Sequence, residues 1–454
     1  MVRVPGSLRI RPRRGRWLLA LFFPSFFGNL PIPALAEESP RVQDAAAAVQ
    51  TPENGNAGRG VQLAFHDAEV PEGHDAELRA RKEARRVGSF LVHLNFAVAE
   101  SYDDNIFATR NNPASDFITI VAPRIHAVSD WGRHELKFQG SSHLAYYKHH
   151  GGEDYQDFNL QTKGRYDLDG GGNLFGGVWF GRDHEDRESP DDVFGAEPIT
   201  YYDLRTFGGY SESFGRFFLR AGGRFDKLDF NDVKAAGGGE INEDDRDRTV
   251  VTGGARAGYR LNSVITPFLQ AGIDRRGYLH TPDDNGFDRD SLGYRIIAGT
   301  EAAFASNLHG EVFAGYLRQD YDSRALPDVE GPAFGGQLHW SASPETSVRF
   351  FVDRTVDETT IGGASAALNT SGGARVRHDF SERFYAVLRA AHGVREFEGI
   401  DRDDRLTTTA ALLAYEFTEQ LALKAEYHFE HMRSSAGSQD FDVNHVFVGL
   451  ESYF

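Results

Sequence analysis

The chain has 454 residues and no cysteine, which excludes disulfide bonds and thiolate metal sites. Its 67 acidic residues outnumber 49 basic ones, and a formal net charge of −18 would repel the phosphates of nucleic acids. Beyond the amino terminus no apolar run reaches roughly 18 residues, which excludes a bundle of transmembrane helices. A soluble β-rich protein and a membrane β-barrel both remain open, since a barrel strand presents an apolar residue to lipid only at every second position.

Residues 1–36 carry the pattern of a secretory signal peptide. Six arginines precede a short apolar segment at 17–30, and Ala34-Leu35-Ala36 supplies a cleavage site with small residues at both ends. The apolar segment is too short to span a bilayer. The pattern therefore predicts export across the inner membrane and removal of this segment.

Residues 37–88 have a different composition. Large apolar residues are sparse, while proline, glycine and charged residues are frequent. A segment of this kind cannot bury enough apolar surface to form a packed core. We therefore expect a flexible periplasmic extension over 37–88.

From residue 89 to the end, apolar residues recur at every second position, which predicts β-strands with one apolar face. The first run places Phe90, Val92, Leu94, Phe96 and Val98 on that face. It is long enough for a transmembrane strand, which needs about 9–11 residues. Similar apolar faces are expected from alternate residues within 136–146, 158–168, 217–225, 292–304, 406–414 and 421–429.

The final segment, 440–454, shows the same alternation and ends on an aromatic residue. Val446, Val448, Leu450 and Phe454 share one parity. Such an ending resembles the terminal strand of bacterial outer-membrane β-barrels, which implies that Phe454 is an assembly signal recognised by the outer-membrane assembly machinery. We expect this strand to pair with the first one, near 90–98, and so to close a barrel.

The connections between the strands alternate in length. Short turns such as Ser213-Phe214-Gly215 and Thr418-Glu419-Gln420 alternate with long polar loops such as 183–198 and 231–245. Outer-membrane barrels have short periplasmic turns and long extracellular loops. The sequence therefore predicts an all-β fold over 89–454. It is an antiparallel transmembrane up-and-down β-barrel of about 18 strands, or 16 if two weak strands fail, after a flexible N-terminal extension.

Charged residues occupy the parity opposite the apolar one. An arginine facing lipid at mid-bilayer would cost about 2–4 kcal/mol, so these side chains should point into the lumen. Their mixture suits hydroxyl-rich or anionic solutes, and it equally suits a polar network that braces the barrel. The lumen-facing candidates are Arg220, Arg224, Arg256, Arg349, Arg389, Lys424 and Glu426.

The loops contain runs of acidic and basic residues, among them 182–187 and 243–248. Such runs are typical of solvated loops in which neighbouring charges form salt bridges. Nucleophile elbows, zinc-binding His-Glu-x-x-His pairs and phosphate-binding loops do not occur in the sequence. We therefore predict no enzyme, no catalytic residue, no metal and no cofactor. A barrel-type lipid or sugar hydrolase is a less favoured alternative, because serine and histidine are frequent.

Residues 100–160 resemble a known family. The segment Tyr102-Asp103-Asp104-Asn105-Ile106-Phe107 follows the first strand, a Ser-Asp pair at 115–116 opens the next, and 154–158 opens a later one. This arrangement is similar to that of outer-membrane β-barrel porins associated with exopolysaccharide secretion. The resemblance implies a wide barrel that passes polysaccharide through the outer membrane of a Gram-negative bacterium, with a periplasmic polysaccharide export protein as partner.

Two functional hypotheses follow. The leading one is an outer-membrane channel that assists export of capsular polysaccharide or exopolysaccharide. The alternative is a general diffusion porin for small polar solutes. Both predict contact with outer-membrane lipid and with the assembly machinery, and neither involves nucleic acid.

Overall fold

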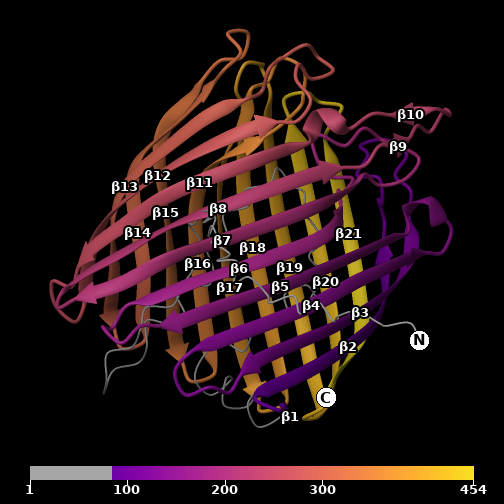
Figure 1. Ribbon diagram of the computed structural model, residues 1–454. Coiled ribbons are helices and arrows are strands. Elements are labelled where there is room, and N and C mark those ends of the chain that lie inside the picture. Colours follow the sequence, from indigo (N-terminus) through magenta and orange to yellow (C-terminus); the bar gives the residue numbers. More distant parts are fainter. Residues whose placement is uncertain (1–83) are drawn as a thin grey trace, which may run out of the picture.

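The computed structural model describes residues 84–454, so the expected signal peptide and most of the expected extension lie outside the described residues. The described chain forms a closed barrel of eighteen antiparallel strands (Figure 1). The last strand pairs with the first, from Asn95 opposite Tyr453 to Asp103 opposite His445. The prediction of an 18-stranded barrel closed by the two terminal strands is confirmed.

The barrel strands have 12 to 16 residues each, which is enough to cross a bilayer while tilted. Among residues 84–454, no helix is long and apolar enough to cross a membrane. The barrel strands are β2 (Phe90–Asp103), β3 (Asp116–Ser129), β4 (Glu135–Tyr147), β5 (Tyr155–Asp167), β6 (Asn173–His184), β7 (Thr200–Phe214), β8 (Phe217–Phe230), β11 (Arg248–Tyr259), β12 (Ile265–Tyr278), β13 (Ser291–Ala305), β14 (Leu308–Tyr321), β15 (Val329–Ser343), β16 (Thr346–Glu358), β17 (Ala366–Ser381), β18 (Phe384–Phe397), β19 (Asp403–Thr418), β20 (Leu421–Ser434) and β21 (Phe441–Tyr453).

Three short strands and two single helical turns complete the described chain. The strand β1 (Arg85–Val87) folds back on the start of β2 through Gly88, whose φ of +60° suits a tight turn. Residues 85–87 therefore belong to a β-ladder, although the sequence predicts a flexible extension there. The others are β9 (Val233–Lys234), β10 (Glu240–Ile241), η1 (Gly151–Glu153) and η2 (Asp244–Arg246).

Short and long connections lie at opposite ends of the barrel (Figure 1). The predicted short turns are confirmed. Between β7 and β8, for example, only Gly215 and Arg216 intervene, and Gly215 has the positive φ that such a hairpin requires. The carboxyl terminus lies at the end with the short turns, which in outer-membrane barrels faces the periplasm.

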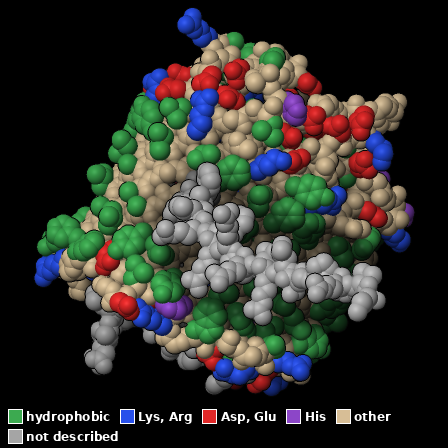
Figure 2. Space-filling view, in the orientation of Figure 1, with side chains coloured by type: hydrophobic (Ala, Val, Ile, Leu, Met, Phe, Trp, Pro, Cys, Tyr) green, Lys and Arg blue, Asp and Glu red, His purple; other side chains and the backbone are tan. Residues whose placement is uncertain are grey.

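The outer face of the barrel is apolar. Leu94, Phe96 and Val98 are exposed on β2, while the alternating Ala97 and Ala99 are buried. In the space-filling view, hydrophobic side chains lie between charged side chains that gather over the loops and over the opposite rim (Figure 2). This surface suits a hydrocarbon surrounding with polar groups at both boundaries.

The predicted apolar face was wrong for β19. Leu412 and Ala414 are buried, whereas Leu413 and Tyr415 of the other parity are 51% and 44% exposed. Both parities of this strand are apolar, so alternation alone cannot select the outer one. The register decides, because Leu412 lies opposite the buried Val387 of β18.

Phenylalanine and glycine face each other on the inner wall. The register places Phe218 opposite Gly258, Phe268 opposite Gly299, and Phe351 opposite Gly373. A Cβ atom added to any of these glycines would collide with the opposing ring. The rings therefore lie flat over the glycines instead of projecting into the barrel, which gives both abundant residue types a structural role.

We propose that Phe454 also serves the assembly of the barrel, and its deletion tests this. Phe454 and Leu94 exchange two backbone hydrogen bonds, of 2.8 and 3.0 Å, whose loss would cost about 1 kcal/mol each. Deletion should lower the amount of protein in the outer membrane far more than this loss explains. Quantitative blotting of membrane fractions measures the effect.

The matched control is Phe380→Ala, which removes another exposed aromatic side chain at the rim with the short turns. We expect this variant to reach the membrane normally. Normal membrane levels of the protein lacking Phe454 would contradict a role in assembly.

Candidate functional site in the barrel interior

Several of the charged residues selected from the sequence form hydrogen bonds and ion pairs with side chains of neighbouring strands. Arg256 lies on the parity opposite the exposed apolar one. Its Nη1 donates to Glu311 at 2.8 Å and to Glu301 at 3.2 Å, and its Nε donates to Gln270 at 2.7 Å. These partners come from β12, β13 and β14. Arg256 therefore links four neighbouring strands through side chains on one face of the sheet.

The remaining predicted residues lie on the corresponding parity of their own strands, in several separate groups. Arg220 is directly opposite Arg256, while Arg224 donates to Asp226 at 2.7 Å. Other ion pairs join Arg389 to Glu426 at 3.5 Å and Lys424 to Glu451 at 2.5 Å. Arg349 lies opposite Arg375. Whether these side chains line the path of a solute stays a prediction.

The loop between β6 and β7, residues 185–199, reaches the opposite side of the barrel. The Asp191 carboxylate accepts hydrogen bonds from the Thr359 hydroxyl at 2.6 Å and from the Thr360 N–H at 3.1 Å. Both threonines belong to the loop between β16 and β17, and β8 with β11–β15 separates them from β7 around the wall. The loop therefore crosses the barrel at the end that carries the long loops.

Buried Arg187 anchors the near side of the crossing loop. Its guanidinium forms a two-pronged pair with Glu153, with distances of 2.8 and 2.9 Å, and a further pair with Asp192 at 3.1 Å. It also donates to the carbonyl of Gly195 at 3.0 Å. One side chain thus ties three points of the loop to the connection between β4 and β5.

A second buried arginine, Arg246, holds the loop from the neighbouring connection. It pairs with both carboxylate oxygens of Glu185 at 2.7 Å and with Glu243 at 3.1 Å. The Ser189 hydroxyl donates to the same Glu185 at 2.7 Å, and the guanidinium lies 4.2 Å from the Phe230 ring centre. Charge-assisted hydrogen bonds of this kind are about twice as strong as neutral ones.

The far side of the crossing is built on Arg289, which is 1% exposed. Its Nε pairs with Asp283 at 2.6 Å, and its Nη1 donates to the carbonyls of Thr359 at 2.7 Å and Ala364 at 2.8 Å. These bonds fix the loop between β16 and β17 in the shape that receives Asp191. Two cavities of about 20 and 10 Å³ adjoin Asp191, the larger with room for roughly one water.

Two loop carboxyl groups have shifted acidities. Burial raises the pKa of Asp192 to about 6, although the neighbouring Arg187 guanidinium acts in the opposite direction. Burial likewise raises the pKa of Glu243 to about 7 against the opposing influence of Arg246. Both groups therefore bind protons more strongly in the closed loop than they would in an open one.

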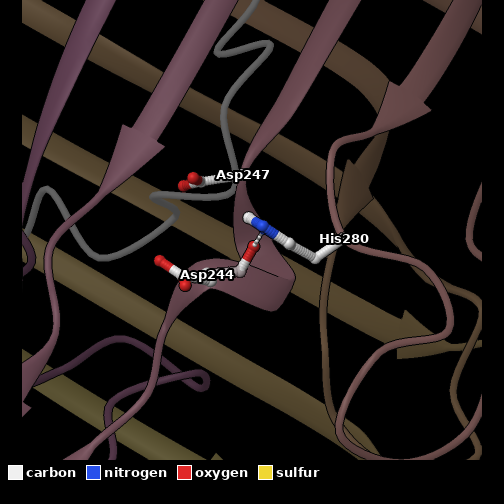
Figure 3. A group of neighbouring side chains, drawn as sticks. All are labelled: Asp244, Asp247 and His280. Carbon is white, nitrogen blue, oxygen red and sulfur yellow. Dashed lines mark hydrogen bonds between the residues drawn. The ribbon is translucent and has the colours of Figure 1, made fainter.

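Asp244, Asp247 and His280 form a cluster between two long loops (Figure 3), with potential metal-ligand atoms within 4.8 Å of one another. His280 Nδ1 lies 3.0 Å from the Asp244 carbonyl, and Asp247 accepts the Phe230 N–H at 2.6 Å. The first contact joins the loop after β12 to the loop before β11, and the second joins that loop to the end of β8. The observed contacts hold the two long loops together next to the end of β8.

The sequence predicts that the runs of charged residues in the loops form salt bridges and are solvated. The prediction of salt bridges is confirmed, and the prediction that these side chains are solvated is wrong. Arg187 and Arg246 do form salt bridges, yet both are buried. The role of Asp191 could not be predicted from the sequence, because its hydrogen-bond partner Thr359 is 168 positions away in the chain. Arg375 was also missed, although Arg375 and Arg377 flank Val376 on one parity in the way the other inner arginines do.

The comparisons with known proteins identify the family. Residues 83–454 match the family model described as "Putative beta-barrel porin 2". The chain belongs to this family. The barrel and the porin family together indicate the outer membrane of a Gram-negative bacterium. None of the curated proteins matches the chain.

Solved porins of Pseudomonas aeruginosa are similar to this chain at low sequence identity. OpdO is 14% identical with a TM-score of 0.43, and the match covers 82% of this chain and 98% of OpdO. OccK2 (OpdF) is 11% identical with a TM-score of 0.45, and the match covers 81% and 99%.

Replacing Arg187 should release the crossing loop. Arg187→Met leaves the buried carboxylates of Glu153 and Asp192 without their main partner, and breaking such a pair costs about 3–5 kcal/mol. We expect the loop to become sensitive to protease and the single-channel conductance to rise. Limited proteolysis with mass spectrometry and planar-bilayer recordings measure these effects.

Lys234→Met is the matched control, because it removes an exposed ion pair between Glu197 of the same loop and β9. Exposed pairs contribute little, so this variant should behave like the wild type. If Arg187→Met kept the wild-type cleavage pattern and conductance, the arginine would not be the anchor.

Acid should tighten this region. The folded-state pKa values of Asp192 and Glu243 lie above their ordinary values, so the stability they contribute is largest at low pH and is lost as pH rises through about 6 to 7. Hydrogen exchange in 185–199, corrected for intrinsic rates, should slow between pH 8 and pH 5.5. Faster corrected exchange at pH 5.5 would contradict the assignment.

Proposed function

We propose that this porin is a passive channel for small polar solutes. The observation that carries the proposal is the bond between Asp191 and the threonine pair Thr359-Thr360 on the opposite side of the barrel. A loop held across the lumen divides the passage and limits the width of what can pass. Small solutes can move beside such a loop, whereas a wide polymer requires its displacement.

Export of polysaccharide has weaker support. It is motivated by the resemblance of residues 100–160, and family membership supports a channel without specifying a polymer. Displacing the loop would break the buried ion pairs that Arg187 and Arg246 form with their glutamate partners. Breaking such pairs costs several kcal/mol. The diffusion channel therefore ranks first, and the export channel second.

The proposed solute path runs along the inner wall. The candidate residues there combine guanidinium, ammonium and carboxylate groups with the amide of Gln270, as in the group around Arg256. Such a wall offers hydrogen bonds in many directions to hydrated solutes. It supports passage of polar molecules without a requirement for one shape.

A reversible crosslink tests whether transport needs loop movement. Asp191→Cys with Thr359→Cys places thiols where side-chain atoms now lie 2.6 Å apart, and the natural chain has no cysteine. Oxidised protein in liposomes should admit small sugars at a rate within about twofold of the reduced protein, since the loop stays in place. Liposome swelling measures the rate.

The proposal would fail if only the reduced form admitted solutes, because transport would then require an open loop.

A deletion strain separates the two functions in the cell. Unchanged surface polysaccharide with slower uptake of small solutes supports the diffusion channel. Loss of surface polysaccharide with normal solute uptake would instead favour export.

A further inference from the structure

Three side chains with metal-binding groups converge where two long loops meet. Asp244 lies in η2, Asp247 follows η2 directly, and His280 comes from the loop after β12 (Figure 3). Each residue offers one ligand atom, and these atoms lie within 4.8 Å of one another. The ligands of a tetrahedral zinc ion lie about 3.3 Å apart, because each is about 2.0 Å from the metal. The three groups therefore need to approach one another by at most about 1.5 Å to share one ion.

The hydrogen bond of His280 prepares its imidazole ring for a metal ion. The ring nitrogen Nδ1 lies 3.0 Å from the carbonyl oxygen of Asp244. A carbonyl oxygen only accepts, so Nδ1 carries the proton and the neutral ring keeps a lone pair on Nε2. Histidine ligands of metal ions donate their other ring N–H in this way, which fixes the tautomer and the orientation of the ring. His280 is exposed, so an ion can reach it from the solvent.

Asp247 brings a buried negative charge to the cluster. The residue is 6% exposed, and one of its carboxylate oxygens accepts the Phe230 N–H at 2.6 Å. Within residues 84–454, neither Asp247 nor Asp244 forms an ion pair with an arginine or a lysine. Burying a carboxylate without a compensating positive charge is costly. A cation held between the two aspartates and the neutral His280 would offset this cost.

Backbone contacts already hold the two loops in place around the cluster. The Leu279 N–H donates to the Asp247 carbonyl at 2.8 Å, and the Asp247 N–H donates to the Asp244 carbonyl at 3.1 Å. The main chain that carries the three ligands is therefore ordered before an ion arrives. Such an arrangement reduces the entropy that is lost on binding.

We propose that Asp244, Asp247 and His280 bind one divalent transition-metal ion of the Zn²⁺ type. Calcium and magnesium prefer sites built from oxygen ligands, whereas an imidazole combined with carboxylates suits zinc. Three protein ligands leave one position of a tetrahedral ion to water. The site could not be predicted from the sequence, because His280 is 36 positions from Asp244 in the chain. The inference goes beyond the proposed channel and does not depend on which solute passes.

The ion would also stiffen the segment that carries Arg246. This arginine lies between the two aspartates in the chain, and its guanidinium binds Glu185 of the crossing loop at 2.7 Å. An ion shared by the three ligands ties the segment to the loop after β12. Zn²⁺ should therefore slow hydrogen exchange over 243–248 and 279–284 in the full-length protein.

Metal titrations of the full-length, detergent-solubilised protein test the site. After a chelator has removed bound metal, calorimetry with Zn²⁺ should show one tight site per chain, and Ca²⁺ and Mg²⁺ should bind at least about tenfold more weakly. Asp247→Asn removes the charge but keeps an oxygen that can accept the Phe230 N–H. His280→Gln removes the imidazole from the other loop. Each variant should lower the Zn²⁺ affinity by about tenfold or more.

Asp401→Asn is the matched control, because it changes an exposed aspartate in a different long loop. This variant should bind Zn²⁺ as the wild type does. Since His280 is exposed, His280→Gln tests the site even where Asp247→Asn lowers the yield of folded protein. Equal Zn²⁺ affinity in the wild type and in His280→Gln would overturn the proposal. Tighter binding of Ca²⁺ or Mg²⁺ than of Zn²⁺ would overturn the assigned class of ion.

Discussion

Every backbone N–H and C=O group of a segment that crosses hydrocarbon needs a partner within the protein, and the rest of this structure follows from that requirement. The bonds between β2 and β21 satisfy it for the last two edges of the sheet. Closure makes the residue alternation meaningful, since one parity meets lipid and the other meets the interior. The up-and-down order of the strands gathers the long connections at one end, where they can fold over or into the barrel.

The interior is organised by charge more than by apolar packing. The crossing loop contains few large apolar residues, and arginines at its base, Arg187 and Arg246, replace a hydrophobic core with buried ion pairs. Such pairs are costly to bury and still more costly to break, so they favour one geometry over its alternatives. A loop held in this way narrows the channel without closing it by apolar collapse.

The fold could be predicted from the sequence because its signals are local. Alternation and turn residues act over a few positions, and together they give the strand number and the two rims. The signals fail where the choice is not local. Leu412 and Leu413 are equally apolar, so only the neighbouring strand decides which one faces inward. The alternation of residues likewise identified Arg349 and Arg389 as candidates. That both lie in register with Arg375 depends on the pairing of three strands, which the sequence does not show.

Each phenylalanine that faces a glycine on the inner wall makes the residue choice at one position depend on the residue at another position far away in the sequence. A Cβ atom at Gly299 would lie 2.5 Å from the Phe268 ring and 2.5 Å from the Val312 carbonyl oxygen, so enlarging Gly299 would displace both the ring and the neighbouring strand. Replacing Phe268 alone would uncover the backbone beside the glycine. A substitution at one of the two positions is therefore expected to require a compensating change at the other. The lumen diameter of such barrels should drift in paired steps, and the covariation of phenylalanine with glycine would record the pairing of strands in related sequences.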